Sequence, residues 1–423
     1  MRTLEVPYWI VGVFIVVIVI LAAPFIAFHW VNVRELSPQT VQQAVMIMGL
    51  CLTFQWPTSF YTGALMGLQR QVLLNVLNSV MATFRGLGAV IVLWLVSPTV
   101  LAFFSWQILS SALQTGLIAF FLWRNLPKAP DSPHFRGDLL LNIWRFAAGV
   151  TGITVMATLL TQTDKIILSR MLPLKTFGYY TLASTVAMTL YRFFGPVFSA
   201  VYPRFTNLIA LRDEEGIKAL YHKSAQLVSV IVLPAAIVLA LFSKEILLLW
   251  TQDAATAENT YLLVSLLVIG TALNGLMNIP YALQLASGWT SLAFCVNIVS
   301  VAVLVPLMIM LTKLFGTPGA ASVWVILNGG YVLFAIQLMH RRLLRREMRR
   351  WYLDDVGLPL GAALIGAGLG RWLISNQMPT LLLLMSLVVI LAWTMFGSVL
   401  AAPQIREWFC NRILRIKVTY HGA

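Results

Sequence analysis

The sequence predicts an all-α polytopic membrane protein, and three observations support that prediction. Of the 423 residues, 59% are apolar and only 10% are charged, and the mean hydropathy is +0.84. A soluble globular protein carries about 25% charged residues, so a soluble core could not bury this much apolar surface. Apolar runs of about 20 residues, the length of a helix that crosses the hydrocarbon layer, recur along the whole chain. A transmembrane β-barrel would show short alternating segments instead.

About twelve transmembrane helices are predicted, joined mostly by short connections. Three connections are longer and polar: Arg124–Asp138, which is rich in Pro and charge, Arg204–Lys223, and the basic segment His340–Asp355. The second of these, with its LRDEEGIK run, predicts an amphipathic helix on the membrane surface. The first span lacks a small-residue cleavage site after a short apolar region, so we expect a retained helix and not a signal peptide. In chain order, the predicted spans are 8–29, 41–66, 72–96, 99–123, 141–169, 176–202, 222–243, 257–285, 291–312, 318–339, 356–374 and 380–400.

The positions of Lys and Arg predict that both termini face the cytoplasm. With that orientation, the RRLLRREMRR run and the basic tail after Pro403 fall on the cytoplasmic side, where basic loops are expected. The tail predicts either a basic amphipathic helix on the anionic inner surface or a disordered basic segment. The net charge of +14 is therefore explained without nucleic acid. The opposite loops and span ends keep Arg34, Arg170, Lys175, Lys244, Lys313 and Arg371.

A weak internal repeat predicts two pseudo-symmetric helical bundles, the arrangement in which many transporters hold substrate. Pro57 and Asn78 lie in one stretch, and Pro280 and Asn297 lie in the other, at separations of 223 (280 − 57) and 219 (297 − 78) residues. Four spans precede the polar linker and six follow it, so we expect a first bundle that lacks its opening two helices through truncation. The predicted organisation is 1–123, a four-helix bundle; 124–140, a cytoplasmic linker; 141–340, a six-helix bundle; and 341–423, a basic segment, two extra helices and an amphipathic tail.

Five ionisable residues lie deeper inside the predicted spans than any others, and such groups mark a pathway or a binding partner by default. Four of the five are cationic, which indicates an anionic substrate, because the guanidinium fork suits phosphate oxygens. Those nearest the span ends could instead reach the interface with their charged ends, and the carboxylate could simply neutralise a neighbouring Lys or Arg. The five residues are Arg85, Arg145, Asp164, Lys165 and Arg192.

Helix-breaking residues inside the spans, Pro57, Gly195, Pro196 and Pro280, are candidate hinges for alternating access or ordinary kinks. No catalytic constellation, metal site or cofactor motif is predicted. The three cysteines and five histidines are scattered in sequence. The run Gly361–Gly370 lies inside an apolar span, where small residues favour close helix packing.

The stretch Thr163–Ala183 (TDKIILSRMLPLKTFGYYTLA), continuing through YRFFGP and VYPRF to EILLLWT at 245–251, resembles the Wzx-type polysaccharide or O-antigen flippases of the MATE-like superfamily. The segments Arg2–Glu5 and Gly67–Gln71 fit the same family. The resemblance implies two six-helix bundles around a central cavity, often followed by two further helices. It also implies flipping of undecaprenyl-pyrophosphate-linked oligosaccharide across the bacterial inner membrane, with membrane lipids and the polysaccharide polymerase and chain-length machinery as partners. The chain departs from the family at its start, which puts transport competence in doubt.

Two alternatives remain open from the sequence. A cation-coupled exporter of the same superfamily would favour carboxylates in the membrane, and Asp164 is the only one well inside a predicted span. A non-transporting membrane partner of the polysaccharide machinery, or an inactive truncated product, would carry the same apolar pattern.

Overall fold

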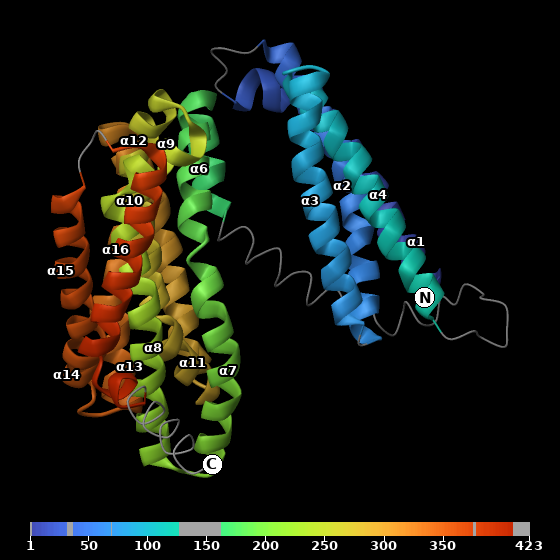
Figure 1. Cartoon of the computed structure of the whole chain (residues 1–423). Coiled ribbons are helices and arrows are strands. Elements are labelled where there is room, and N and C mark those ends of the chain that lie inside the picture. Colours follow the sequence, from blue (N-terminus) through green and yellow to red (C-terminus); the bar gives the residue numbers. More distant parts are fainter. Residues whose placement is uncertain (1, 32–36, 69, 127–161, 375–377, 409–423) are drawn as a thin grey trace, which may run out of the picture. The chain divides into compact units, whose positions relative to one another are not determined.

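The computed structural model describes residues 2–31, 37–68, 70–126, 162–374 and 378–408, and in these residues every regular element is a helix. The chain divides into two compact units, Met1–Gln162 and Thr163–Ala423, and each is described by itself (Figure 1). The predicted all-α membrane fold is confirmed. Arg145 and most of the predicted span 141–169 lie outside the described residues.

The described part of unit 1 contains four α-helices, and polar side chains cap the starts of two of them, α2 and α4. Ser37 accepts a hydrogen bond of 3.1 Å from the backbone N–H of Thr40, and Thr99 accepts one of 3.2 Å from Ala102. Helix α1 packs on α2, and α4 packs on both α2 and α3. The helices are α1 (Arg2–Phe25), continued by the π-helical turn η1 (Ile26–Trp30), α2 (Pro38–Gly67), α3 (Gln71–Leu95) and α4 (Val100–Asn125).

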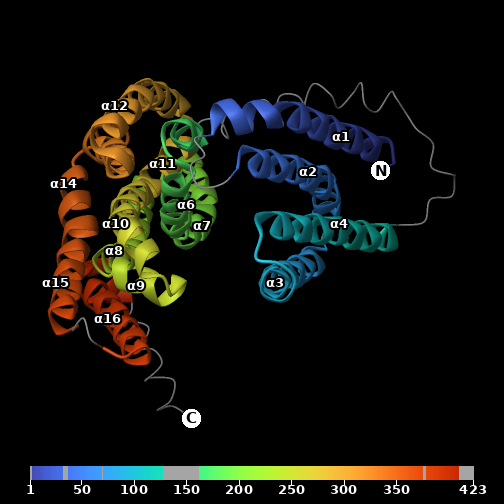
Figure 2. The same cartoon turned by 90° about the horizontal axis from the view of Figure 1, so that it is seen from above.

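Unit 2 forms a larger bundle around α8 and α10, and α15 and α16 pack beside α8 (Figure 2). Its core joins buried side chains such as Tyr180, Phe194, Tyr221 and Trp351. The described helical elements are 162–171, α6 (Leu174–Met188), α7 (Tyr191–Ala210), α8 (Glu214–Leu241), α9 (Ser243–Thr251), α10 (Ala254–Leu276), α11 (Asn278–Ala286), α12 (Thr290–Gly330), η2 (Tyr331–Ala335), α13 (Ile336–Leu343), α14 (Met348–Arg350), η3 (Trp351–Gly357), α15 (Leu358–Leu373) and α16 (Thr380–Ala401).

Eight helices in the described part of the chain are long and apolar enough to cross a membrane. One of them, at Ile298–Leu343, covers most of the predicted span 291–312 and all of 318–339. Those two spans are separated at Gly316, whose φ of 65° and ψ of −143° lie outside the helical region. Glycine adopts this conformation without the steric cost that a Cβ would bring.

The predicted surface helix at Arg204–Lys223 is wrong. Helix α7 continues to Ala210, a tight turn follows with Arg212 at a φ of 55°, and α8 begins at Glu214. The carboxylate of Asp213 caps α8 by accepting a hydrogen bond of 2.8 Å from the N–H of Gly216. The acidic residues of this segment therefore occupy the first turn of a long helix, where the helix dipole favours negative charge.

The helix boundaries of the two units repeat at one offset. Helix α2 ends at Gly67 and α3 begins at Gln71, whereas α11 ends at Ala286 and α12 begins at Thr290, which gives 286 − 67 = 219 and 290 − 71 = 219. Packing follows the same order, since α1 contacts α2 and α2 contacts α4, as α8 contacts α10 and α10 contacts α12. Asn78 and Asn297 are separated by the same 219 residues (297 − 78), so the weak sequence repeat has a structural counterpart.

Candidate functional site

In unit 1 the central feature is Arg85, a half-buried residue of α3. Its Nη2 atom donates a hydrogen bond to Oε1 of Gln114 on α4, and Nε2 of Gln114 donates one of 3.3 Å to Oδ1 of Asn78. Its Nε atom is buried and has no hydrogen-bond partner in the described residues. A buried charged donor without a partner is costly, so Arg85 is held here at a cost in stability, as expected of a group kept inside the membrane for function.

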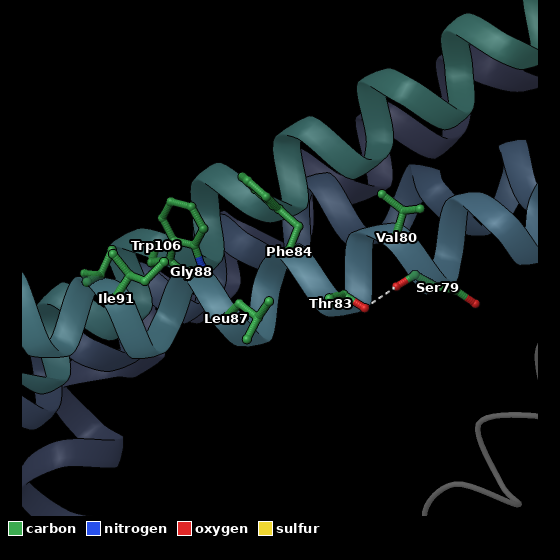
Figure 3. A pocket seen from close by; sticks show the side chains of 9 residues that line it. Ser79, Val80, Thr83, Phe84, Leu87, Gly88, Ile91 and Trp106 are labelled. Atoms are coloured by element: carbon green, nitrogen blue, oxygen red, sulfur yellow. Dashed lines mark hydrogen bonds between the residues drawn. The ribbon is translucent and has the colours of Figure 1, made fainter.

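The side chain of Trp106 on α4 holds the backbone at Arg85. Nε1 of Trp106 donates a hydrogen bond of 3.0 Å to the carbonyl oxygen of Arg85. The indole lies over Gly88, where an added Cβ would come within 2.0 Å of Cζ2 of Trp106. Figure 3 shows the apolar groove beside this contact, with a cavity volume of about 600 Å³. It is lined by Ser79, Val80, Thr83, Phe84, Leu87, Gly88, Ile91, Val92 and Trp106.

A second polar seam joins α2 to α4. Nε2 of Gln55 donates a hydrogen bond of 3.2 Å to Oγ of Ser111, and the hydroxyl groups of Thr58 and Thr115 lie 2.7 Å apart. These residues and Gln114 are not among the candidates predicted from the sequence, because none of them is ionisable. The run QILSSALQT at 107–115 places amide and hydroxyl side chains along one predicted span, and that pattern could have identified α4 as a polar-lined helix.

In unit 2 the equivalent seam joins three elements. Asn274 of α10 is related to Gln55 by the offset of 219 (274 − 55). The hydroxyl of Tyr191 donates a hydrogen bond of 3.0 Å to Oδ1 of Asn274, whose Nδ2 donates one of 2.8 Å to Oδ1 of Asn328 on α12. In each unit an amide side chain therefore bridges two helices that correspond by this offset. They are α2 and α4 in unit 1 and α10 and α12 in unit 2, and the partner residues differ.

Arg192 follows Tyr191 directly and is exposed on α7. Its side chain has no hydrogen bond or ion pair with any described residue. The two sides of α7 differ, because the buried residues are aromatic and aliphatic whereas the exposed residues are mixed. Phe194, Val201 and Phe205 are buried, and the exposed residues include both apolar side chains, such as Phe193, and polar ones, such as Arg192 and Ser199.

Two helix interruptions of unit 2 lie next to each other. The first separates α6 from α7 at Thr189–Leu190, and the second separates α10 from α11 at Met277. They are joined by the Tyr191–Asn274 hydrogen bond, and Phe194 of α7 packs against Gly275 of α10. Paired interruptions of this kind give two neighbouring helices a common place to bend.

The candidate hinge residues occupy three different settings. Gly195 and Pro196 lie inside α7, in the second turn after its interruption, and buried Pro280 lies in the first turn of α11. Pro57 is also buried, but α2 continues through it without an interruption. Pro57 therefore differs from Gly195–Pro196 and from Pro280, each of which follows a helix interruption.

Asp164 and Lys165 are both half-buried on the helical segment 162–171. Oδ2 of Asp164 accepts a hydrogen bond of 3.0 Å from the hydroxyl of Tyr180, which is 1% exposed. No hydrogen bond or ion pair between described residues joins Asp164 to Arg192. Arg85 belongs to unit 1, whereas Asp164, Lys165 and Arg192 belong to unit 2.

The side chains described at these sites are suited to binding a ligand through hydrogen bonds and charge. Within the described residues, no group of three or more His, Cys, Asp and Glu side chains is placed to hold a metal ion. The sites offer guanidinium, amide and hydroxyl groups, which bind anions and sugars by hydrogen bonds.

Comparisons with known proteins add three findings. A sequence model of a family described as polysaccharide biosynthesis protein matches residues 5–253. The putative O-antigen transporter of Shigella flexneri is 21% identical over 299 residues, which cover 70% of this chain and 70% of that protein. The structure of the lipid II flippase MurJ in an inward closed conformation matches with a TM-score of 0.71 at 12% identity, covering 94% of this chain and 82% of that chain.

Proposed function

This chain belongs to the polysaccharide biosynthesis protein family, and we propose that it flips undecaprenyl-pyrophosphate-linked oligosaccharide units across the bacterial inner membrane. The proposed cargo has an anionic pyrophosphate, a polar sugar unit and a long apolar tail. A carrier for it needs cations without fixed counter-ions, polar side chains for the sugars and contact with the lipid phase.

One observation carries the proposal: Arg85 lies in a membrane helix without an ion-pair partner among the described residues. Its recorded partner is the neutral amide of Gln114, so the positive charge is held in place without being neutralised. A carboxylate at that position would cancel the charge and remove the attraction for phosphate oxygens. The named relatives, a putative O-antigen transporter and a lipid II flippase, support a lipid-linked cargo for this chain as well.

Arg192 supports the same function from unit 2. Its exposed guanidinium stands on the side of α7 that is not packed into the bundle, and a charged side chain within the bilayer is tolerated where it faces a wet cavity. The adjacent interruptions at Thr189–Leu190 and Met277 would let this face tilt while the Tyr191–Asn274 bond keeps the two helices together. Arg192 would then bind the anionic group in one orientation of the helices and release it in the other.

Complementation of a flippase-deficient strain tests the proposal. The variants are Arg85→Ala and Arg192→Ala, and the matched control is Arg349→Ala, which removes an exposed arginine of the basic segment. We expect the first two variants to lose surface polysaccharide while reaching normal amounts in the membrane, and the control to complement. Full complementation by both test variants would exclude these residues as the anion site.

We also propose that both termini face the cytoplasm. The basic segment from Arg341 to Arg350 joins α13 to α14 and supports this orientation, because Lys and Arg concentrate in cytoplasmic loops. A fluorescent protein fused after Ala423 should then fold and fluoresce, whereas a periplasmic phosphatase fused at the same place should remain inactive. The opposite pair of results would reverse the orientation.

A further inference from the structure

A buried ionic cluster lies at the end of unit 2 where α7 turns into α8 and α13 turns into α14. Its centre is the ring of His222 on α8, which is 0% exposed. Nδ1 of His222 lies 2.5 Å from Oδ2 of Asp355, and Nε2 lies 3.0 Å from Oε2 of Glu347. Both ring nitrogens therefore face carboxylate oxygens, which only accept hydrogen bonds when ionised.

The cluster joins four separate parts of unit 2. Asp355 lies in the π-helical stretch η3, and its Oδ1 accepts a hydrogen bond of 2.9 Å from Nε2 of Gln226 on α8. Oε1 of Gln226 in turn accepts one of 2.9 Å from the backbone N–H of Gln404, which follows α16. The same few side chains thus tie α8 to the start of the α15 helix and to the end of α16.

Hydrogen-bond counting shows that the cluster must hold one proton beyond those of a neutral ring. A neutral imidazole donates from one nitrogen and accepts at the other, so it satisfies one of the two carboxylates. The second carboxylate would then face a lone pair at hydrogen-bond distance. The conflict disappears when His222 carries both protons or when one carboxyl is protonated. Because Asp355 is 0% exposed, an uncompensated charge there would be costly.

The neighbouring charged and titratable groups do not remove this requirement. Those that face the cluster are Tyr221 and Lys218 on α8, His340 on α13, Arg350 on α14 and Tyr352 in η3. Arg350 lies 4.0 Å from Glu347 and lowers the cost of that carboxylate, but it does not reach His222.

His340, in contrast to His222, has the hydrogen-bond partners of an ordinary neutral histidine. Its Nδ1 lies 2.9 Å from the carbonyl oxygen of Ile336, and its Nε2 lies 3.2 Å from the hydroxyl of Tyr221. One donor and one acceptor satisfy a neutral ring there, so His340 needs no additional proton.

Water has access to the cluster from one side, since the side chain of Glu347 is 19% exposed whereas those of His222 and Asp355 are 0% exposed. A proton can therefore enter or leave at Glu347 without crossing the bundle. The π-helical turns that carry Asp355 are a weak form of helix, often found where a helix must change shape.

We propose that His222, Asp355 and Glu347 form a proton-binding site that keeps the C-terminal helix pair α15–α16 docked on α8 while it is occupied. Loss of the proton leaves a carboxylate facing an imidazole lone pair, and admitting water between α8 and η3 relieves that repulsion. The inference goes beyond the proposed function, because it concerns docking of two helices and does not depend on the cargo.

Thiol labelling of purified protein in detergent tests this site without any transport assay. Val356 of η3 is 8% exposed and adjoins Asp355, so Val356→Cys reports opening, and Leu211→Cys in the exposed α7–α8 turn serves as reference. Both are made after Cys51, Cys295 and Cys410 are replaced by Ser. The ratio of the two maleimide labelling rates cancels the common dependence of thiol reactivity on pH.

With the cluster intact, we expect the ratio to rise about tenfold or more between acidic and alkaline pH, because breaking a buried ion pair is strongly destabilising. Glu347→Gln should hold the ratio low at every pH, since the new amide donates to Nε2 of a neutral His222 while Nδ1 donates to Asp355. His340→Gln should keep the pH response. A flat ratio with the cluster intact, or an unchanged response in Glu347→Gln, would overturn the proposal.

Discussion

The hydroxyl of Tyr191 donates a hydrogen bond of 3.0 Å to Oδ1 of Asn274, and this bond joins the two helix interruptions of unit 2. Tyr191 is the first residue of α7, and Asn274 lies in the last turn of α10, two residues before its end at Leu276. The bond therefore spans the place where both helices can change direction. It also positions Arg192, the next residue of α7, on the exposed side of the bundle.

Tyr191→Phe removes this bond without changing the shape of the ring. We expect a loss of about 1 kcal/mol in the free energy of unfolding, the typical net value of one hydrogen bond. Thermal unfolding in detergent measures it, and a double-mutant cycle with Asn274→Ala isolates the pair. Strictly additive effects of the two substitutions would mean that the bond contributes nothing.

Gly88→Ala should destabilise unit 1, because the new Cβ would come within 2.0 Å of the Trp106 ring. Displacing the indole also breaks its hydrogen bond to the carbonyl of Arg85. Overpacking of this kind costs about 1–3 kcal/mol. Gly86→Ala is the matched control, since nothing lies within 4 Å of a Cβ at that position on the same helix. Equal unfolding temperatures for the two variants would contradict the steric argument.

Much of the fold could be predicted from the sequence, because a helix of about 20 apolar residues has few alternatives in lipid. The family resemblance found in the 163–251 stretch is confirmed by a match that spans residues 5–253. The interruptions were harder to place, since Thr189–Leu190 and Met277 fall inside the single predicted spans 176–202 and 257–285. Met277 lies within one turn of Pro280, whose missing N–H and clash with the preceding turn explain that interruption, whereas Thr189–Leu190 lies more than one turn before Pro196 and is not explained in this way.

The side-chain partners could not be predicted, because they depend on how helices far apart in the sequence rotate against one another. Arg85 is hydrogen-bonded to Gln114, which is 29 residues away in the sequence, and His222 contacts Asp355, which is 133 residues away. The five histidines are scattered in sequence, yet His340 is hydrogen-bonded to Tyr221, the residue next to His222. Asp355 was missed for a simpler reason, since the predicted span began one residue after it.

Gln114→Glu should abolish transport while preserving the fold. The substitution keeps the shape of the side chain that Arg85 contacts and turns the contact into an ion pair, which neutralises the proposed anion site. We expect surface polysaccharide to fall by more than about tenfold, and a tenfold weaker affinity for the cargo would require a loss of only about 1.4 kcal/mol in binding free energy. Gln43→Glu adds the same charge at an exposed position of α2 and serves as control. Normal complementation by Gln114→Glu would mean that the charge of Arg85 is not used for binding.

The pH dependence of stability should include a contribution from Asp253, which caps α10. The hydroxyl of Thr256 first, and then the backbone N–H groups of Ala255 and Thr256, hold the pKa of this carboxyl below its usual range. A depressed pKa in the folded state favours folding at pH values above the unfolded pKa of about 3.9, and this contribution is lost as the pH falls through the folded value.

Asp253→Asn keeps a good capping side chain but cannot ionise, so it should remove only the pH-dependent part of the stability. The measurement is the midpoint of thermal unfolding in detergent between about pH 3 and pH 6, spanning the ordinary carboxyl range. We expect the difference between the original protein and Asp253→Asn to shrink steadily toward the acidic end. A difference that stays constant over this range would mean that the cap acts through geometry alone, without preferring the ionised carboxylate.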